Sequence, residues 1–432
     1  MRLDSLQLTP VQPLRAASSV SRPAAPFSAP AATSRAATLQ KPDQLLRSRP
    51  AQGTVPASPI SLFETQPAAG LPESPHTPED YGRIFDWVEK VTGAPIALQT
   101  PKARQAYIEA IQGKPQQAYD TQGFLDSIGV HHAKTYGRDD RGVHKLVTSI
   151  DGFSPHSHHV SKPLQIAQKT FFWVFKTFPK TFDKIASLVD KHYFTRKDNK
   201  AQSWIKVPVP QPGISPDEPL LPPQQVKASY NGNLFSRYLK QGALPSTQAI
   251  FDRYFSHNPP KEIGLLFEHD FHKGVPQPGE TPHNYGTYAI ARQLGFSHEQ
   301  ATRFGSANYD MDLNNTIYGD TDAFPDAKPS RHFNLNKERP EQGDTRFVWA
   351  QKHLDAAVEL ARRGRFDQAE RELGYGLHSI QDAFAHGHIR LASHAVTGQI
   401  PDGVPYNPVG AYEATKATIG YLKAYIERIE AL

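Results

Sequence analysis

Apolar residues recur at helical spacing through most of the second half of the chain. From Phe347 to Arg363 they return every three or four residues, which matches one face of an α-helix. The same pattern predicts helices over residues 81–91, 101–111, 281–294, 297–307, 347–363, from 366 onward, and 412–432. Ser297 and Gln300 have the spacing of a capping box at the start of one of them. The C-terminal half is therefore expected to be mostly helical, with an irregular insertion over residues 314–344.

An aromatic stripe predicts a further helix in the middle of the chain. Its members are spaced by three or four residues: Phe171, Phe175, Phe178, Phe182, Ile185 and Val189. Lysines surround the stripe, and Pro179 is expected to kink or interrupt the helix. The favoured interpretation is an ordinary core helix, because an apolar stripe usually packs inward. The alternative is a helix that lies at a lipid interface with its lysines beside the headgroups.

Residues 119–160 show no clear periodicity. They contain His131 and His132, and a second group of histidines at His156, His158 and His159. These imidazoles could bind a metal. Their prolines and serines favour a polar loop instead.

Composition divides the chain into four parts. Residues 1–80 are rich in Ala, Ser, Thr, Pro and Arg and hold too few apolar residues to offset the entropy of ordering, so a disordered tail is expected. Residues 206–228 are predicted to be an extended linker, because seven prolines fall within residues 208–223. The linker would separate a helical middle region, residues 81–205, from a C-terminal domain, residues 229–432.

The bulk properties restrict the chemistry and the partners. The 432 residues include no cysteine, so a metal would be held by His, Asp, Glu or backbone atoms. A net charge of +5 suits an anionic partner, either a phospholipid surface or nucleic acid. No apolar run is long enough to predict a transmembrane helix, and the N-terminus lacks the apolar segment of a secretory signal peptide. The Ser/Ala/Pro-rich tail is instead consistent with a non-cleaved export signal of bacterial effectors, with an organellar transit peptide as the weaker alternative.

The strongest candidate for chemistry is the segment from Leu373 to His388, LGYGLHSIQDAFAHGH. His378, Asp382 and His386 follow one another at intervals of four, so on a helix each step turns by only about 40°. An apolar stripe on the same helix indicates that the polar stripe also faces inward. Buried imidazoles and carboxylates need partners, and a metal shared with residues elsewhere would supply one.

The order of these motifs resembles the zinc-dependent phospholipase C family and the related zinc nucleases that cut single strands. The motifs are His283 in GETPHNYG, the ANYDMDLNN segment, His332 in SRHFN, and the RGRFDQAERELGYGLHSIQDAFAH block. The resemblance covers residues 263–432 and implies an all-helical domain that binds two or three Zn²⁺ ions. A still closer likeness, in DFHKG and TYAIARQLGFSHEQA, is to bacterial metal-binding relatives.

The resemblance also implies a set of ligands. The expected zinc ligands are His283, Asp310, His332, His378, Asp382 and His386, with His388 as the competitor of His386. Asp270 and His272 are candidates to replace the N-terminal amine that completes one site in the secreted phospholipases. His394 and Asp402 could stand in for a C-terminal His-x-x-x-Glu pair that this chain lacks.

The expected activity is hydrolysis of phosphodiesters, most directly phospholipids. The protein would act as a secreted effector or toxin that leaves the cell without a cleavable signal peptide. If it is not secreted, it would be cytoplasmic. Zinc suits a donor set of imidazole and carboxylate, and Asp310 or Asp312 could deprotonate the attacking water. Two alternatives remain. One is a nuclease acting on single-stranded nucleic acid, and the other is a non-catalytic, metal-stabilised interaction domain.

Overall fold

The computed structural model describes residues 77–92, 95–112, 122–131, 139–150, 153, 162–188, 217–230, 244–256, 286–314, 331–334, 343–397 and 403–432. All of them belong to one compact unit, Thr65–Leu432. Every regular element in these ranges is helical, which confirms the prediction of a mainly α protein. Among the described helices, none is both long and apolar enough to span a bilayer.

Most of the predicted helices are present with bounds close to those expected. The described elements are α1 (Pro78–Thr92), α2 (Pro101–Gln112), α3 (Gln122–Ser127), α4 (Asp140–Ser149), α5 (Lys162–Thr177), α7 (Pro223–Ala228), α9 (Thr247–Phe251), the π-helical turn η2 (Asp252–Ser256), α10 (Gly286–Gln293), α11 (His298–Asn314), α13 (Thr345–Arg362), α14 (Phe366–His386), α15 (Leu391–Thr397), the 3₁₀ turn η6 (Val404–Tyr406) and α16 (Pro408–Glu430). A further helix covers residues 179–188.

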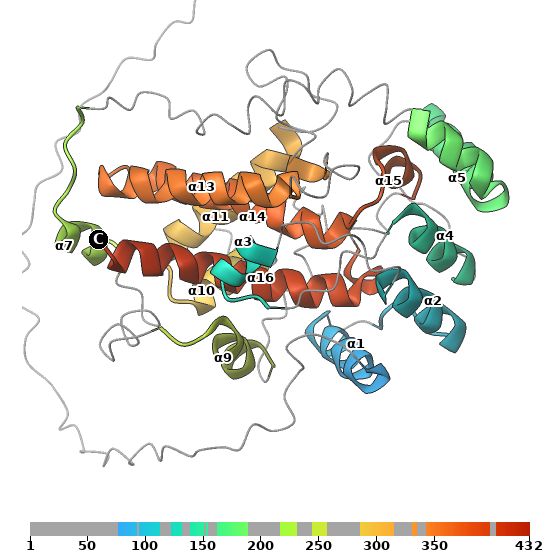
Figure 1. Cartoon of the computed structure of the whole chain (residues 1–432), viewed down its shortest axis with the longest axis horizontal. Helices are drawn as coiled ribbons and strands as arrows, with labels where there is room; N and C mark the ends of the chain where they lie inside the picture. The colour runs from blue at the N-terminus through green and yellow to red at the C-terminus, as the bar shows by residue number, and fades with distance from the viewer. Residues whose placement is uncertain are drawn as a thin grey trace, which may run out of the picture. The chain divides into compact units, whose positions relative to one another are not determined.

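Helix α14 lies between three other long helices. It packs most extensively against α13 and α11, and then against α16. Figure 1 shows α13, α14 and α16 running side by side. Gly374 allows α11 to approach closely, because a Cβ atom there would lie 2.5 Å from the carbonyl oxygen of Phe304. The C-terminal part of α14 is consequently buried on all sides, from Gly376 to His386.

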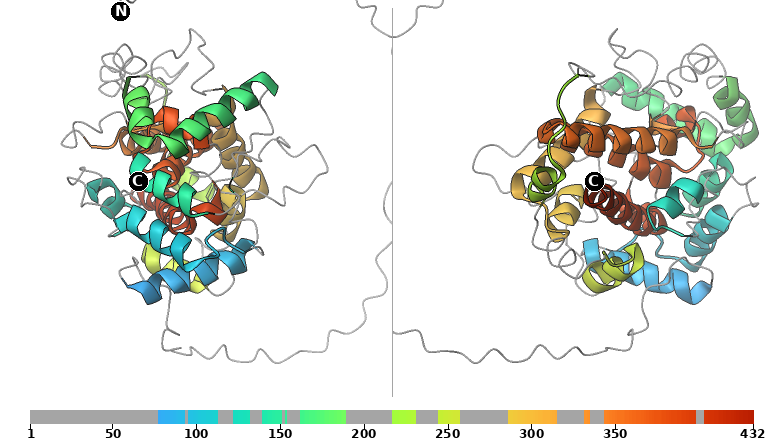
Figure 2. Two further views of the ribbon diagram at one scale, coloured as in Figure 1. Left: turned by 90° about the vertical axis from the view of Figure 1, so that its right-hand side faces the viewer. Right: turned by 60° about the vertical axis from the view of Figure 1, so that its left-hand side comes forward.

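One hydrophobic core joins the two sides of the expected linker. Trp87 of α1 contacts Phe251 and Tyr412 with its ring and donates a hydrogen bond of 2.8 Å to the carbonyl oxygen of Phe255. Figure 2 shows α1 beside α9 in both views. Helix α16 is buried around its whole circumference, as expected of a helix at the centre of a core. The described helices from residues 81–205 and from residues 229–432 therefore pack as one body, and α7 lies within the expected linker.

Side-chain caps begin several of these helices. The capping box predicted at Ser297 is confirmed, since Ser297 Oγ accepts from the Gln300 amide at 3.2 Å and Gln300 Oε1 accepts from the Ser297 amide at 2.8 Å. The Asp344 side chain accepts from the Arg346 amide at the start of α13, and the Asn407 side chain accepts from the Gly410 amide at the start of α16. These caps satisfy amide groups that a helix leaves without internal partners.

The prediction of a polar loop over residues 119–160 is wrong in part. Helices α3 and α4 both lie in this range. Val143, Leu146 and Val147 form a short apolar stripe on α4, which packs against α2. The stripe is only one helical turn long, so the histidines and serines near it favoured the prediction of a loop over that of a helix. His156, His158 and His159 lie outside the described residues.

The aromatic stripe, predicted as an ordinary core helix interrupted at Pro179, is buried only in part. Pro179 interrupts it as expected, because α5 ends at Thr177 and a second helix starts at Pro179. Phe175 and Phe182 are buried, whereas Phe171 and Phe178 are each 49 % exposed. The two helices therefore bring only part of the stripe into the core.

Substitution of Gly374 by Ala tests the close approach of α11 and α14. The added methyl group would meet the Phe304 carbonyl oxygen and lie 2.6 Å from Ala307 Cβ, so the helices must separate. We expect Gly374→Ala to lower the free energy of unfolding by about 1–3 kcal/mol. The control is Gly82→Ala on α1, where no atom lies within 4 Å and helix propensity alone should raise stability by roughly 0.5–1 kcal/mol. Denaturant unfolding followed by circular dichroism measures the stability of both variants. Equal changes in the free energy of unfolding, in the same direction, would contradict the close packing of α11 on α14 at Gly374.

Candidate metal centre

Three buried side chains bring one donor atom each to a common point. His378 and Asp382 lie one turn apart on α14, and His332 comes from the short segment 331–334. Their donor atoms all lie within 4.8 Å of one another. His332 Nδ1 is 2.8 Å from Asp382 Oδ2, His378 Nε2 is 3.1 Å from the same oxygen, and the two nitrogens are 3.1 Å apart. These three residues form the donor triangle.

The dimensions of the donor triangle fit a small divalent cation. Metal–ligand bonds of about 2.1 Å place neighbouring donors about 3.0 Å apart in octahedral geometry and about 3.4 Å apart in tetrahedral geometry. The observed separations of 2.8 to 3.1 Å lie within about 0.2 Å of the octahedral value and about 0.3–0.6 Å below the tetrahedral one. A donor set of two imidazoles and one carboxylate suits Zn²⁺ or Fe²⁺. The residues present therefore fit a metal ion.

The tautomer of His378 strengthens this interpretation. Asn308 on α11 donates its amide hydrogens to Gln381 Oε1 at 2.9 Å and to Thr287 Oγ1 at 3.0 Å. Its Oδ1 atom therefore faces His378 Nδ1, at 3.0 Å, and accepts that proton. In the neutral ring this leaves a lone pair on Nε2, directed at a carboxylate oxygen. Two acceptors 3.1 Å apart need a cation or a proton between them.

Asn308 is thus a typical outer partner of a metal-binding histidine. Such a partner fixes both the tautomer and the orientation of the ring. Gln381 extends the network by donating to Thr287 Oγ1 at 3.0 Å and Thr418 Oγ1 at 3.2 Å. Helices α10, α11, α14 and α16 all contribute to holding one imidazole, although no local pattern in the sequence predicted these polar contacts.

The charge of the triangle is set by its surroundings. Burial works against ionisation of Asp382, but His378 and His386, with the hydrogen bond from His332, hold the pKa of that carboxyl well below its usual value. Asp382 is therefore a carboxylate at neutral pH, as a metal ligand must be. The three residues are only 4–6 % exposed, so an unbalanced charge here would be costly.

A buried arginine fixes the end of α14 that carries these ligands. Arg346 is fully buried and forms a bidentate pair with Asp344, the N-cap of α13. It also donates to the backbone carbonyls of Asp382, at 2.9 Å, and Gly387, at 2.7 Å. Burial raises and Arg346 lowers the pKa of Asp344, with a net lowering. Arg346 therefore connects the start of α13 to the last turn of α14.

The remaining predicted site residues have different positions. His386 Nδ1 lies 2.9 Å from the His332 carbonyl oxygen and 3.9 Å from Asp382 Oδ2, so this nitrogen supports the backbone that carries His332. Ligation by His386 stays a prediction. His388 is buried beyond the end of α14, and the His394 ring lies 4.5 Å from that of His386.

Asp310 lies on α11 outside the donor triangle. It is partly exposed, and burial raises its pKa while Arg371 acts in the opposite direction. The backbone of Asp312 belongs to the same helix. The candidate ligands Asp270, His272 and His283, and the possible substitute Asp402, lie outside the described residues.

Comparison of the chain with models of protein families, with curated proteins and with solved structures finds no match. The fold and the site define an all-α protein with a buried His–His–Asp group that could hold a metal ion. The number and identity of the ions are matters for proposal.

Removal of a triangle ligand tests the metal centre. We expect the full chain to bind at least one Zn²⁺, and His378→Ala and Asp382→Ala each to bind at least one fewer, by mass spectrometry of the native protein. A chelator should lower the thermal midpoint of the wild type, because metal bound only to the folded state stabilises it, and should leave that of the variants unchanged.

The matched control is His298→Ala, which removes an exposed imidazole from α11. It should retain the wild-type stoichiometry and the response to chelator. Wild-type zinc content in folded His378→Ala and Asp382→Ala would exclude the donor triangle as the metal site.

Proposed function

We propose that the protein is a zinc-dependent phosphodiester hydrolase that cleaves phospholipids in the manner of a phospholipase C. The observation that carries the proposal is the donor triangle, in which two imidazoles and one carboxylate meet at metal-binding distances without a thiolate. Zinc held by three protein ligands supplies a Lewis acid for the phosphoryl group and makes water acidic near neutral pH. Lipid degradation by a secreted effector would follow from this activity.

An unpaired buried arginine favours an anionic substrate. Arg331 directly precedes the ligand His332, is 6 % exposed, and forms no ion pair with any described residue. Its guanidinium lies 4.5 Å from the centre of the Trp349 ring, and Nη1 lies 3.3 Å from Met311 Sδ. Burial lowers its pKa to about 10, and Glu372 offsets this only in part. A phosphate group beside it would neutralise a charge that has no ion-pair partner among the described residues.

Asp310 is the proposed proton acceptor for the attacking water. It lies on α11, two residues after the Asn308 that orients His378. Its partly buried carboxyl has a raised pKa, which brings it nearer to the range in which a general base is most effective. Burial is the main cause of the raised pKa of Tyr375 on α14, and the charge of Asp310 raises it further. Asp310 therefore interacts electrostatically with the helix that carries the ligands.

The non-catalytic alternative rests on the burial of the triangle. Ligands that are 4–6 % exposed resemble a closed structural site more than an open catalytic one. The same metal would then stabilise the contact between α14 and the segment 331–334. Stoichiometric zinc without hydrolysis of any diester would favour this alternative over the enzyme.

Hydrolysis by matched variants tests the proposal. We expect the wild type to release phosphocholine from phosphatidylcholine vesicles and to cleave bis(p-nitrophenyl) phosphate. Asp382→Ala should lose both metal and activity. Asp310→Asn should keep its metal while kcat falls by roughly 100-fold or more. Because a base must be deprotonated, the wild-type rate should rise with pH through the pKa of Asp310, and this acid limb should be absent from Asp310→Asn.

The control is Asp86→Asn, which removes an exposed carboxylate from α1 and should leave kcat unchanged. Cleavage of single-stranded DNA in place of the lipid would identify the nuclease alternative. Full activity in folded Asp382→Ala would sink the proposed mechanism.

A further inference from the structure

Exposed apolar side chains concentrate on α5 and on the helix over residues 179–188. Of the large apolar residues exposed in the described part of the chain, all but Leu220 lie on these two helices or, in the case of Phe178, between them. The docking face is defined as Ile166, Trp173, Phe178, Ile185 and Leu188, whereas Phe171 points about 160° away from Trp173 around α5. Trp173 is 57 % exposed and Leu188 is 67 % exposed.

The docking face is the outer side of a helix pair that is well anchored. Phe172, Phe175, Phe182 and Ala186 are buried from the same two helices. Helix α5 packs on α4 and α15 and lies on the side of the molecule away from α7 (Figure 1). The pair therefore has two apolar sides, of which one fills the core and the other faces solvent.

Positive charge surrounds the docking face. Lys169, Lys176, Lys180 and Lys184 are all exposed on the two helices. The one described acid on these helices, Asp183, forms an ion pair with Arg390, which also pairs with Asp140 at 2.9 Å. The described side chains of these two helices therefore carry more positive than negative charge.

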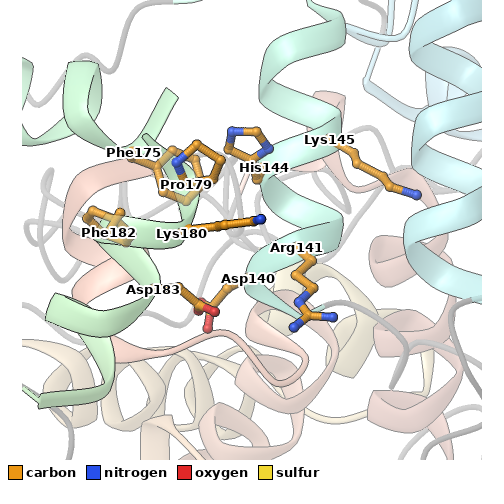
Figure 3. A pocket seen from close by; sticks show the side chains of 9 residues that line it. All are labelled: Asp140, Arg141, His144, Lys145, Phe175, Pro179, Lys180, Phe182 and Asp183. Atoms are coloured by element: carbon orange, nitrogen blue, oxygen red, sulfur yellow. The ribbon is translucent and has the colours of Figure 1, made fainter. Parts of the chain in front are cut away.

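A pocket of about 410 Å³ opens between α4 and the helix over residues 179–188. Figure 3 shows the Lys180 side chain crossing it toward α4, between His144 and Arg141. Phe175 and Phe182 form an apolar wall on the opposite side. Arg141 and Lys180 supply cations, while the two acids of the lining are those already paired with Arg390. The lining residues from the helix over residues 179–188 lie on the opposite side of that helix from Ile185 and Leu188, so the pocket is separate from the docking face.

The composition of the docking face separates the classes of partner. Lysine is depleted in the cores of protein–protein interfaces, whereas this face is surrounded by lysines. Single-stranded nucleic acid stacks its bases on aromatic rings. Ile166, Ile185 and Leu188 are aliphatic and provide no ring for stacking. Aromatic and aliphatic tips with a lysine border match a surface that lies in the headgroup region of an anionic bilayer.

We propose that α5 and residues 179–188 dock on a bilayer of anionic phospholipids. The apolar tips enter the boundary between headgroups and acyl chains, and the lysines remain at headgroup level. This inference does not rest on the proposed hydrolase, because binding is measured without turnover.

Co-sedimentation of the full chain with vesicles tests the proposal, with chelator present so that metal-dependent cleavage cannot interfere. The wild type should bind vesicles of 70 % phosphatidylcholine and 30 % phosphatidylserine at least tenfold more tightly than vesicles of phosphatidylcholine alone. Emission from Trp173 should shift to the blue on binding, since the indole leaves water. Lys176→Glu/Lys184→Glu and Trp173→Ser/Leu188→Ser should each weaken binding at least tenfold.

Two controls remove similar groups elsewhere. Leu220→Ser changes an exposed large apolar residue away from both helices, and Lys102→Glu reverses an exposed charge on α2. Both should bind as the wild type does. Equal binding to the two kinds of vesicle, or wild-type binding by the variants of the docking face, would overturn the proposal. The proposal would also be overturned if single-stranded DNA bound the wild type, displaced it from vesicles, and bound the same variants more weakly.

Discussion

The mutual approach of His332 Nδ1, His378 Nε2 and Asp382 Oδ2 is the constraint on which the site depends. Three polar atoms meet there at 2.8 to 3.1 Å, and because Asn308 takes the Nδ1 proton of His378, a neutral His378 ring has no proton on Nε2 to donate to Asp382. A cation at the common point would satisfy all three. The fold also supports their positions: Arg346 holds the last turn of α14, and His386 holds the carbonyl of His332.

Packing around α14 explains how such a polar group can exist in a core. Gly374 brings α11 close enough for Asn308 to reach His378. The surrounding apolar residues keep water from the ligands, which are 4–6 % exposed. Low polarity strengthens the attraction between the ligands and a cation, and it makes the same group costly without one. Metal binding and folding are therefore expected to be coupled.

How far the sequence predicts the structure depends on how many residues separate the interacting side chains along the chain. His378 and Asp382 could be paired from their spacing of four on one helix, and the capping box at Ser297 is equally local. His332 was included only through a family resemblance, because 46 residues separate it from His378 and no periodicity connects them. No sequence pattern indicated that Asn308 orients His378 or that Arg346 holds the end of α14, since both roles arise from contacts between helices.

The aromatic stripe shows a different limit. Its spacing predicted helix and a break at Pro179 correctly, but periodicity cannot tell whether a second apolar side faces the core or the solvent. Phe175 is buried and Phe178 is 49 % exposed, although they belong to one stripe. In the same way, α4 was missed because its stripe of Val143, Leu146 and Val147 is short.

Anomalous diffraction at the zinc absorption edge, from crystals of the full chain grown with Zn²⁺, tests the central claim most directly. A peak within about 2.0–2.2 Å of His332 Nδ1, His378 Nε2 and Asp382 Oδ2 is the predicted result. Zinc bound only elsewhere, with the three donors still at their present separations and no peak between them, would contradict the account.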